Sequence, residues 1–198
     1  MKGIRAWLRR IFEIVSEGHL DILDEYGMPT GGTAHIYDIH EKGHWHATAN
    51  VYIVNSKNEV LLQKRSAGMR VFPNMWTLSA GGHVRAKQNP RDAAIEEVYG
   101  ELGIQVTDSE LVPLRQTRKK EVLLEGKNFD KEFHYNFVVL RDVSIEDIRA
   151  GKMEISDVVW MPIEEYRAIV ERKDPTHVMH ASIPAFFEYV DTAMAPHS

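Results

Sequence analysis

The chain has 198 residues, of which 43% are apolar, 27% charged and 9% aromatic, and its net charge is −5. This composition is typical of a globular domain with its own core, and the negative charge disfavours general nucleic-acid binding, which needs a basic face. The sequence contains no cysteine, which excludes disulfides, thiolate zinc sites and a cysteine nucleophile. No apolar run reaches the length of a membrane span, so we expect a cytoplasmic protein without a membrane partner.

Residues 1–18, MKGIRAWLRRIFEIVSEG, place apolar side chains at helical spacing and basic side chains mostly elsewhere. Charges interrupt the segment too often for the core of a signal peptide. Such an amphipathic helix could lie on an anionic membrane surface, or it could pack on its own domain or on a second subunit. We favour packing, which usually explains amphipathic helices in soluble chains and is compatible with a homodimer.

Strands dominate the first half of the chain. Residues 19–40 predict two strands around a Gly/Pro turn at 27–32. Further along, the run from Arg115 to Lys120 is basic and polar, and we interpret it as a solvated hairpin between two strands. The remaining strands are predicted at 46–55, 59–65, 75–80, 104–117, 132–141 and 157–162.

One helix, from about residue 90 to 102, has clear start and stop signals. Asn89 can cap it, Pro90 suits its first position, Asp92 favours its positive end, and Gly103 closes it. Shorter helices are predicted at 144–151, at 163–172 and from about 184 to 193.

Strands followed by a helix between strands indicate an α/β (α+β) fold, with a mixed sheet sandwiched between helices. We divide the chain into an N-terminal amphipathic helix, a central domain, and a C-terminal helix with its tail. Their bounds are 1–18, 19–175 and 176–198.

Two acids of the central helix, Glu97 and Glu101, are four residues apart and therefore project from the same face. Gly82 lies where the chain leaves a strand, and its backbone carbonyl can approach a metal ion because no side chain intervenes. Carboxylates and a carbonyl suit Mg²⁺ or Mn²⁺, which would neutralise diphosphate charge and lower the pKa of a bound water. A solvated helix edge would also carry two such acids, so their context decides the interpretation.

That context resembles the Nudix box, the signature of the Nudix hydrolase superfamily. The box reads Gly, five residues, Glu, seven residues, then Arg-Glu-apolar-x-Glu-Glu-x-Gly-apolar. The strands before it, HATANVYIVNSKNEVLLQKRS and FPNMWTLSAGGHV, are similar to the branch that includes isopentenyl diphosphate isomerase, and about residues 20–172 are covered. The resemblance implies a Nudix fold. The box positions that match are Gly82, Glu97, Val98, Glu101, Gly103 and Ile104, and those that differ are Gln88, Glu96 and Gly100.

The three departures have different consequences. Gln88 loses a charge but can still accept a hydrogen bond. Glu96 replaces a cation, and a like charge beside the box acids would raise their pKa values unless a metal or another base compensates. Gly100 removes a potential metal ligand and costs roughly 1 kcal/mol in a helix relative to alanine. Either lost selection on the site or the close approach of a ligand or neighbouring backbone would explain this glycine.

Further ligands must come from outside the box, and Glu132 is our first choice. Asp130 and Glu132 lie two apart in a predicted strand and hence on one face. In this family a late glutamate often acts as a base or ligand, although a solvated strand end would look the same. For phosphate binding we expect Lys64, Arg65 and Arg85.

The isomerase branch implies a second possible metal site. His40, His46 and His83, with Asp130 and Glu132, fall near the positions that bind metal in isopentenyl diphosphate isomerase, although His40 and His46 are spaced one residue closer. Imidazoles with carboxylates could hold zinc or manganese. Each histidine alone could equally be a core or surface residue. The isomerase reaction is not expected, because it uses a cysteine where this chain has glycine.

The leading hypothesis is therefore a hydrolase, dependent on Mg²⁺ or Mn²⁺, that cleaves a diphosphate linkage in a nucleoside diphosphate derivative or a similar small molecule. Glu97 and Glu101 would hold the metal and position water, with Glu132 as an additional ligand or base. The alternative is a catalytically silent Nudix fold that binds a ligand or a partner protein. The substrate itself is not predicted, because recognition residues lie in variable loops.

Overall fold

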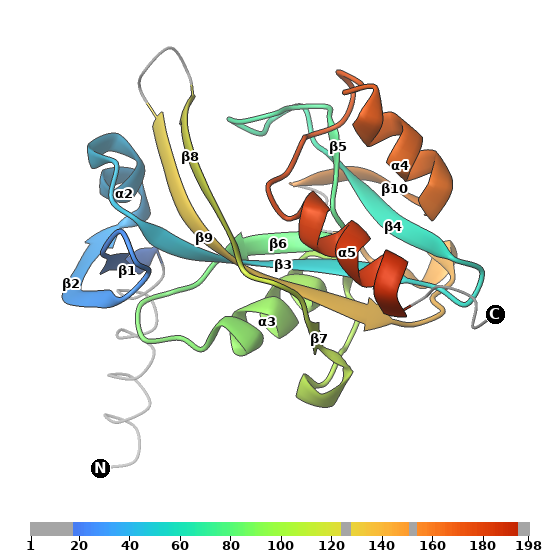
Figure 1. Cartoon of the computed structure of the whole chain (residues 1–198), viewed down its shortest axis with the longest axis horizontal. Helices are drawn as coiled ribbons and strands as arrows, with labels where there is room; N and C mark the ends of the chain where they lie inside the picture. Colours follow the sequence, from blue (N-terminus) through green and yellow to red (C-terminus); the bar gives the residue numbers. More distant parts are fainter. Residues whose placement is uncertain (1–17, 124–127, 151–153, 194–198) are drawn as a thin grey trace.

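A computed structural model describes residues 18–123, 128–150 and 154–193 of the chain, and the predicted N-terminal amphipathic helix lies outside them. The described residues form a large mixed β-sheet with helices on both faces, which confirms the predicted fold class (Figure 1). No helix within these ranges is long and apolar enough to cross a membrane.

The elements follow one another with short connections. In chain order they are β1 (His19–Leu23), β2 (Pro29–His35), α2 (Ile36–Lys42), β3 (His46–Val54), β4 (Glu59–Arg65), β5 (Trp76–Thr77), β6 (Ala80–His83), α3 (Pro90–Leu102), the 3₁₀ turn η1 (Asp108–Glu110), β7 (Val112–Pro113), β8 (Thr117–Leu123), β9 (Asn128–Leu140), the 3₁₀ turn η3 (Ile145–Asp147), β10 (Ile155–Pro162), α4 (Ile163–Glu171) and α5 (Ile183–Ala193).

The main sheet has the strand order β10-β4-β3-β9-β7, with β5 beside β4, β6 beside β3 and β8 beside β9. Strands β3 and β9 run parallel, and the other pairs are antiparallel. Strands β3 and β4 are paired in the sheet only at Val54 and Val60, and they diverge from that point. The opening between them holds β5 and β6, and this opening later positions the site (Figure 1).

Alternation along β3 separates the two faces of the sheet. Ala49, Val51 and Ile53 face α3 and share a core with its buried residues Val98 and Leu102. The apolar stripe of α3 therefore packs on the sheet, while the acids of this helix lie on its other sides.

The opposite face of the sheet has two halves of different character. In one half, Tyr52 stacks on Phe186 of α5, with ring centroids 4.3 Å apart, and the core continues to α4. In the other half the side chains on the same face are polar and pair across the parallel strands. These pairs are His46 with Glu132, Thr48 with His134, and Asn50 with Asn136. Six buried polar residues on neighbouring strands are unusual for a sheet interior and mark this half as functional.

Two sequence predictions need correction. Residues 36–42 form helix α2 rather than the end of a strand, because His35 caps the helix start and Gly43, with a φ of 68°, closes it in the left-handed conformation. The run from Arg115 to Lys120 is not only a solvated hairpin, since residues 117–123 form β8, which pairs with residues 128–134 of β9.

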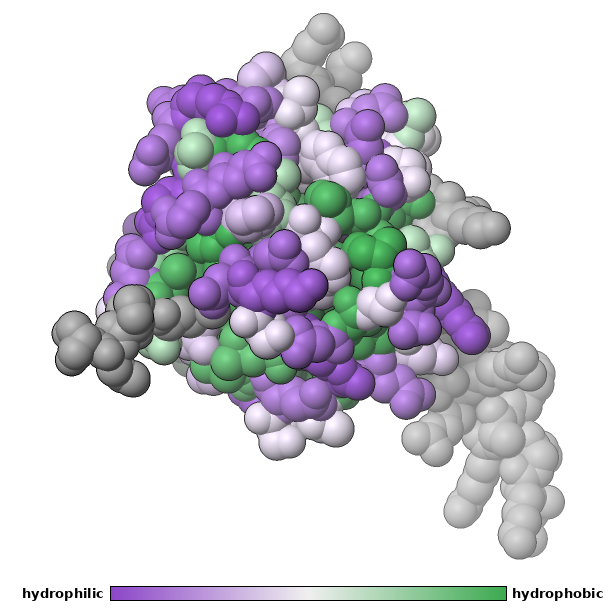
Figure 2. Space-filling model, turned by 90° about the vertical axis from the view of Figure 1, so that its right-hand side faces the viewer, coloured by the Kyte–Doolittle hydropathy of each residue, from purple (hydrophilic) through white to green (hydrophobic). Residues whose placement is uncertain are grey.

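Smaller differences concern three elements. The predicted strand at 104–117 contains the turn η1 and the two-residue strand β7, and the predicted helix at 144–151 is the 3₁₀ turn η3. The strands at 46–54, 59–65 and 155–162 and the helices α3, α4 and α5 lie where the sequence predicts them, within a few residues. On the face shown in Figure 2, hydrophobic patches alternate with hydrophilic ones.

Candidate active site and metal centre

A cavity of about 590 Å³ opens over the polar half of the sheet. Its floor comes from β3, β4, β6 and β9, and its walls come from α2, from the loop at residues 69–72 and from the segment before α5. The polar residues that line it include His40, Asn50, Gln63, Arg65, Arg70, His83, Lys119, Asp130, Glu132, Glu154 and His180.

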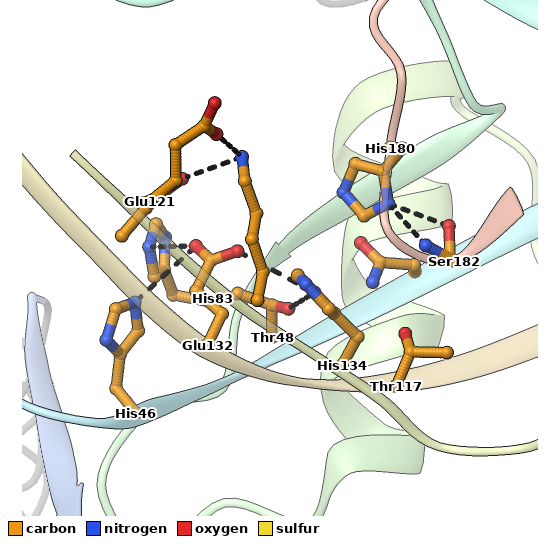
Figure 3. A network of polar contacts seen from close by, with 12 residues as sticks. His46, Thr48, His83, Thr117, Glu121, Glu132, His134, His180 and Ser182 are labelled. Carbon is orange, nitrogen blue, oxygen red and sulfur yellow. Dashed lines mark hydrogen bonds and ion pairs between the residues drawn. The ribbon is translucent and has the colours of Figure 1, made fainter. Parts of the chain in front are cut away.

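Three histidines from three different elements meet at this cavity. His40 comes from α2, His46 from the start of β3 and His83 from the end of β6, and one ring nitrogen of each lies within 4.8 Å of the others. The Nε2 atoms of His40 and His83 are 3.2 Å apart. We call these three residues the histidine cluster; Figure 3 shows two of them, His46 and His83, pointing towards Glu132.

The hydrogen bonds of His46 define its tautomer. Its Nδ1 donates to the carbonyl of His44 at 3.1 Å, so Nε2 carries the lone pair of the neutral ring. This Nε2 is buried, forms no hydrogen bond with the described residues, and lies 3.5 Å from Oε1 of Glu132. Two electron-pair donors at that separation repel each other, so the arrangement fits a cation between them, either a proton or a metal ion.

His40 is oriented in the same way. Its Nδ1 lies 3.3 Å from the carbonyl of Phe129 and 3.4 Å from Oδ1 of Asp130, which leaves Nε2 directed at the cluster. Asp130 therefore contacts the outer nitrogen of His40 and supports the ring, as a partner behind a metal ligand does. Burial and the neighbouring imidazoles lower the pKa of His40, and lower that of His83 to about 3, so both rings are neutral as metal binding requires.

Glu132 lies between the histidine cluster and a fourth histidine. Its Oε1 is 3.5 Å from His46 and 3.9 Å from His83, and its Oε2 is 3.6 Å from Nδ1 of His134 (Figure 3). Burial alone would raise the pKa of Glu132, but the surrounding imidazoles, His46 first, lower it below its usual range. An ionised carboxylate beside neutral imidazoles is a suitable donor set for Zn²⁺ or Mn²⁺.

Asp130, from the same face of β9, is partly neutralised. Its Oδ2 lies 3.3 Å from Nζ of Lys119, which β8 places across from Glu132. Burial, followed by the charge of Glu132, raises the pKa of Asp130 to about 6.

The acids of α3 form a second group, which we call the helix acids: Glu97 and Glu101. Oε2 of Glu101 accepts hydrogen bonds from the backbone N–H of Gly81 and from Nε2 of Gln63, both at 3.0 Å. A Cβ added to Gly82 would overlap the carboxylate of Glu97, so this glycine permits the close approach of the acid. The structure thus brings the predicted glycine and both predicted acids together at the opening in the sheet.

The helix acids are poised for a cation. Burial raises the pKa of Glu97 to about 7, helped by the charges of Glu154 and Glu96. Burial and the charge of Glu97 raise the pKa of Glu101 to about 8. A divalent ion would remove this repulsion, and hard carboxylate oxygens with a nearby carbonyl suit Mg²⁺ or Mn²⁺. Neither acid lines the cavity itself, but Gln63, Gly81 and Glu154 do, so this group lies at the cavity edge.

The like charge of Glu96 is offset by a neighbouring base. Nη2 of Arg85 lies 2.6 Å from Oε2 of Glu96, and Nε2 of Gln88 donates to the same oxygen at 2.9 Å. Gln88 also accepts from the backbone N–H of Arg85. Positions 88 and 96, which usually carry Glu and Arg in the box, therefore still interact. Here the acid is at position 96, and Arg85 supplies the cation.

Gly100 has no steric reason to be glycine. It is exposed, and a Cβ added there would meet no described atom within 4 Å. The φ of Gly100 is not positive, so its backbone conformation does not require glycine. Close approach of the described backbone, which the sequence leaves open as an explanation for this glycine, is therefore excluded.

The predicted phosphate-binding residues lie in three different places. Arg65 lines the cavity, whereas Lys64 lies over the ring of Trp76, 5.8 Å from its centroid, and Arg85 pairs with Glu96. The cavity gains two cations that were not predicted, Arg70 and Lys119. The available signal for Lys119 was its place in a strand facing the acids of β9, which the hairpin interpretation concealed.

Gln63 and His180 were also missed as cavity residues. Gln63 interrupts the apolar run of β4, and a single polar residue in a strand that is otherwise buried and apolar is a usable signal. His180 follows a segment without regular structure, and nothing in its sequence neighbourhood indicates a site.

Comparisons with known proteins agree with this architecture. The family model of the NUDIX domain matches residues 44–181. The chain is 29% identical over 167 residues to Nudix hydrolase 3 of Arabidopsis thaliana, covering 83% of this chain but only 22% of that protein. It is 30% identical to an uncharacterized Nudix hydrolase of Clostridium acetobutylicum, covering 80% of this chain and 77% of that protein.

A third relative is the isopentenyl-diphosphate Delta-isomerase of Mycolicibacterium vanbaalenii, 27% identical over 76% of this chain and 80% of that protein. Among solved structures, a protein of Deinococcus radiodurans superposes with a TM-score of 0.61 at 17% identity, covering 86% of this chain and 97% of its own. The NUDIX domain of Shewanella oneidensis NrtR, crystallised with ADP ribose, has a TM-score of 0.53 at 13% identity, covering 73% and 85%. These structural likenesses concern the fold alone.

Proposed function

Because the chain belongs to the NUDIX family, we propose that it hydrolyses a diphosphate linkage in a small molecule, such as a nucleoside diphosphate derivative, with the help of divalent metal ions. One observation carries the proposal: two separate groups of metal donors, the histidine cluster with Glu132 and the helix acids, adjoin a single cavity that also contains cationic side chains.

The two groups suit different ions. Glu97, Glu101 and the carbonyl of Gly82 would hold Mg²⁺ or Mn²⁺, and Glu154 would complete this shell from the cavity side. His40, His46 and His83 with Glu132 would hold Mn²⁺ or Zn²⁺. Ions so bound would supply charge neutralisation for the diphosphate and a water of lowered pKa.

The cations of the cavity have the complementary role of binding the phosphates. Arg65 lies beside the helix acids, as its electrostatic interactions with Glu101 and Glu154 indicate, and it can reach an oxygen of a phosphate held there. Lys119 lies on the opposite strand beside Asp130, near the histidine cluster. Arg70 adds a further positive charge from the loop at 69–72. Lys64 lies over Trp76 and Arg85 pairs with Glu96, so phosphate binding by these two residues stays a prediction.

A second candidate function is a catalytically silent module that binds a diphosphate ligand or a partner protein. It is favoured by the position of Glu101, which already has two protein hydrogen bonds, and by Gly100, which leaves the box one acid short. Where the ligand is a diphosphate, the two candidates differ only in whether it is cleaved.

The test is a turnover assay on a panel of diphosphates that includes ADP-ribose, with Mg²⁺ and with Mn²⁺. We expect Glu101→Gln to lower kcat roughly 10²–10⁴-fold, because it removes the charge that holds the ion and positions water. Glu96→Gln is the matched control on the same helix, and it should retain most of the activity because Glu96 points outward to Arg85.

Activity that Glu101→Gln retains in full would contradict a role for the helix acids. Binding of panel compounds by the wild-type protein without any turnover would favour the silent module instead. The cytoplasmic location and the homodimer that the sequence suggests remain predictions, which fractionation and sedimentation would test.

A further inference from the structure

His180 lines the cavity and belongs to neither group of metal donors. The chain around it is fixed by the sheet: Trp76 of β5 accepts a backbone hydrogen bond from Val178 at 2.8 Å and donates one to Thr176 at 2.9 Å. The backbone N–H of His180 donates to the carbonyl of Val178, and its own carbonyl accepts from Ile183 at the start of α5. The ring is therefore held in a fixed place.

The hydrogen bonds of His180 determine which ring nitrogen carries the proton. Its Nδ1 lies 3.2 Å from the backbone N–H of Ser182, a group that can only donate. The hydroxyl of Ser182 lies 2.7 Å from the same Nδ1 (Figure 3). Nδ1 is thus an acceptor, and in the neutral ring the proton must be on Nε2.

A chain of buried hydroxyls reinforces this tautomer. The Ser182 hydroxyl lies 2.7 Å from the hydroxyl of Tyr52, which in turn is hydrogen-bonded to Tyr166. If Tyr166 donates to Tyr52, Tyr52 donates to Ser182 and Ser182 donates to His180, and every oxygen in the chain is satisfied. Such a chain polarises in one direction and strengthens the bond to Nδ1.

The other nitrogen of His180 has no hydrogen bond with any described residue, although the side chain lines the cavity and is partly exposed to it. The cations of Arg65 and Lys119 are near enough to act on the ring electrostatically. The Nε2–H is therefore a free, oriented donor at the cavity, in which the cations Arg65 and Lys119 lie among the acids Glu132 and Glu154.

We propose that His180 is a substrate-binding residue that donates its Nε2–H to a non-bridging phosphate oxygen of the substrate. The inference rests on the proposed function in taking a diphosphate as the ligand. An acceptor is required because Nε2 can only donate, and a phosphate oxygen is favoured because Arg65 and Lys119, which line the same cavity, can bind the other oxygens of that group. A sugar hydroxyl would not use the positive charge.

The donor keeps its role across the physiological pH range. Burial, followed by the charges of His134 and Lys119, lowers the pKa of His180 to about 3, so the ring stays neutral and retains the Nε2 proton. A purely structural histidine would need only the bonds to Ser182 and would gain nothing from an exposed second nitrogen. This difference gives the proposal a test that stability alone does not answer.

Two conservative substitutions separate the two nitrogens. In His180→Asn the side-chain amide can replace Nδ1 and keep the contact with Ser182, but nothing replaces Nε2. In His180→Gln the amide nitrogen reaches the position of Nε2 and can still donate. The probe is methylenediphosphonate, a diphosphate that cannot be hydrolysed at its bridge, with Mg²⁺ and Mn²⁺, and its affinity is measured by titration calorimetry on the full chain. His177→Asn, in the same segment but not lining the cavity, is the matched control.

We expect His180→Asn to bind the probe about tenfold to a hundredfold more weakly than the wild type, as for the loss of a hydrogen bond to a charged group. His180→Gln should lose less than about fivefold, and His177→Asn should bind as the wild type does. Equal affinity of His180→Asn and the wild type, weaker binding by His180→Gln than by His180→Asn, or no binding by the wild type would overturn the proposal. Nitrogen NMR of the imidazole must also show the proton on Nε2, and a proton on Nδ1 would overturn it too.

The outcomes remain distinct from those of the turnover assay. If the probe binds through His180 but no panel compound is cleaved, the proposed hydrolysis fails and the role of His180 stands. If compounds are cleaved but both His180 variants bind the probe as the wild type does, only the inference about His180 fails.

Discussion

The histidine cluster and the helix acids are assembled in opposite ways. The helix acids lie one turn apart on α3, so local sequence spacing alone brings them together, and Gln63, Gly81 and Gly82 are their more distant partners. The histidine cluster needs α2, β3 and β6, and its carboxylate Glu132 arrives on β9 through a parallel pairing across 86 residues of chain. The first group depends on helix geometry, and the second depends on the topology of the sheet.

The difference also appears in how each group is satisfied. Glu101 already accepts hydrogen bonds from a backbone and a side-chain donor, and burial is the first cause of the raised pKa of both helix acids, followed by the charges of neighbouring acids. In the histidine cluster, the buried Nε2 of His46 has no hydrogen-bond partner among the described residues and lies 3.5 Å from a carboxylate oxygen of Glu132. We therefore expect the histidine cluster to bind metal more tightly and the helix acids to bind it more reversibly.

The largest expected effect separates the two groups by metal binding. His46→Ala should lower the affinity of the histidine cluster for Mn²⁺ at least about 100-fold, since even residues behind a metal ligand contribute 10–100-fold. Glu101→Gln should leave that affinity nearly unchanged and weaken only a second, lower-affinity Mn²⁺ site. Calorimetric titration with Mn²⁺ checks both. An equal loss of all binding in the two variants would show that the groups act as one site.

The second effect is the pH dependence of stability in the metal-free protein. The pKa values of Glu97 and Glu101 are raised on folding to about 7 and about 8, so the folded state binds more protons than the unfolded chain above pH 4.5. Stability attributed to these acids therefore falls as pH rises towards about 8. Histidines whose pKa is lowered on folding have the opposite effect, because their contribution to stability increases as pH rises. This contribution no longer changes above their ordinary pKa of 6.5.

Between pH 6.5 and about 8 the melting temperature of the metal-free protein should consequently fall by several degrees. Mg²⁺ should remove most of this fall, and Glu101→Gln should reduce it without metal. Thermal scans in a chelator, with and without added Mg²⁺, provide the measurement. A melting temperature that rises through this window would show that the helix acids are ionised in the free protein.

A smaller effect concerns Gly100. Because a side chain there meets no described atom, Gly100→Ala should stabilise the protein by about 1 kcal/mol and raise its melting temperature by about 2–4 °C. Gly103→Ala is the matched comparison and should destabilise, since Gly103 has a φ of 71° and its Cβ would be 2.9 Å from Arg149. A destabilising Gly100→Ala would mean that this position contacts something in solution.

The smallest effect is expected from Arg85→Ala. The pair with Glu96 is half-exposed, so its loss should change the free energy of unfolding by less than about 1 kcal/mol. The pKa of Glu97 should rise further, because Arg85 lowers it. An NMR titration of Glu97 checks the direction of this pKa change. Arg91→Ala, which removes an arginine from the helix of Glu97, is the control. An unchanged titration would show that Glu96 needs no compensation.

The same contrast explains how much could be predicted from sequence. Caps and spacing were sufficient for α3, because the signals at Asn89 and Gly103 are local. Helix α2 was missed because its seven residues bury a single side chain, Ile39, and so carry no stripe to reveal the period. Its remaining signal was Gly43 after a short segment, which a turn explains equally well.

In the candidate site, too, local patterns were predicted from sequence and contacts between distant residues were not. The spacing of the box predicted Glu97 and Glu101 directly, and the resemblance to the isomerase branch gathered the histidines that no local pattern connects. The compensation of Glu96 by Arg85 and the position of Lys119 depend on which side chains face each other across loops and strands. A single sequence does not contain that pairing information.

Helix α5 has a practical consequence for anyone who trims this protein. The family match stops at residue 181, whereas the partners of Tyr52 lie beyond it, in Ser182 and Phe186. A chain cut at that apparent boundary would expose the ring of Tyr52 and the apolar side chains that α5 covers. It would also remove Ser182, the hydrogen-bond partner of His180. We expect such a fragment to precipitate on expression, because α5 contributes Phe186 and Phe187 to the core around Tyr52.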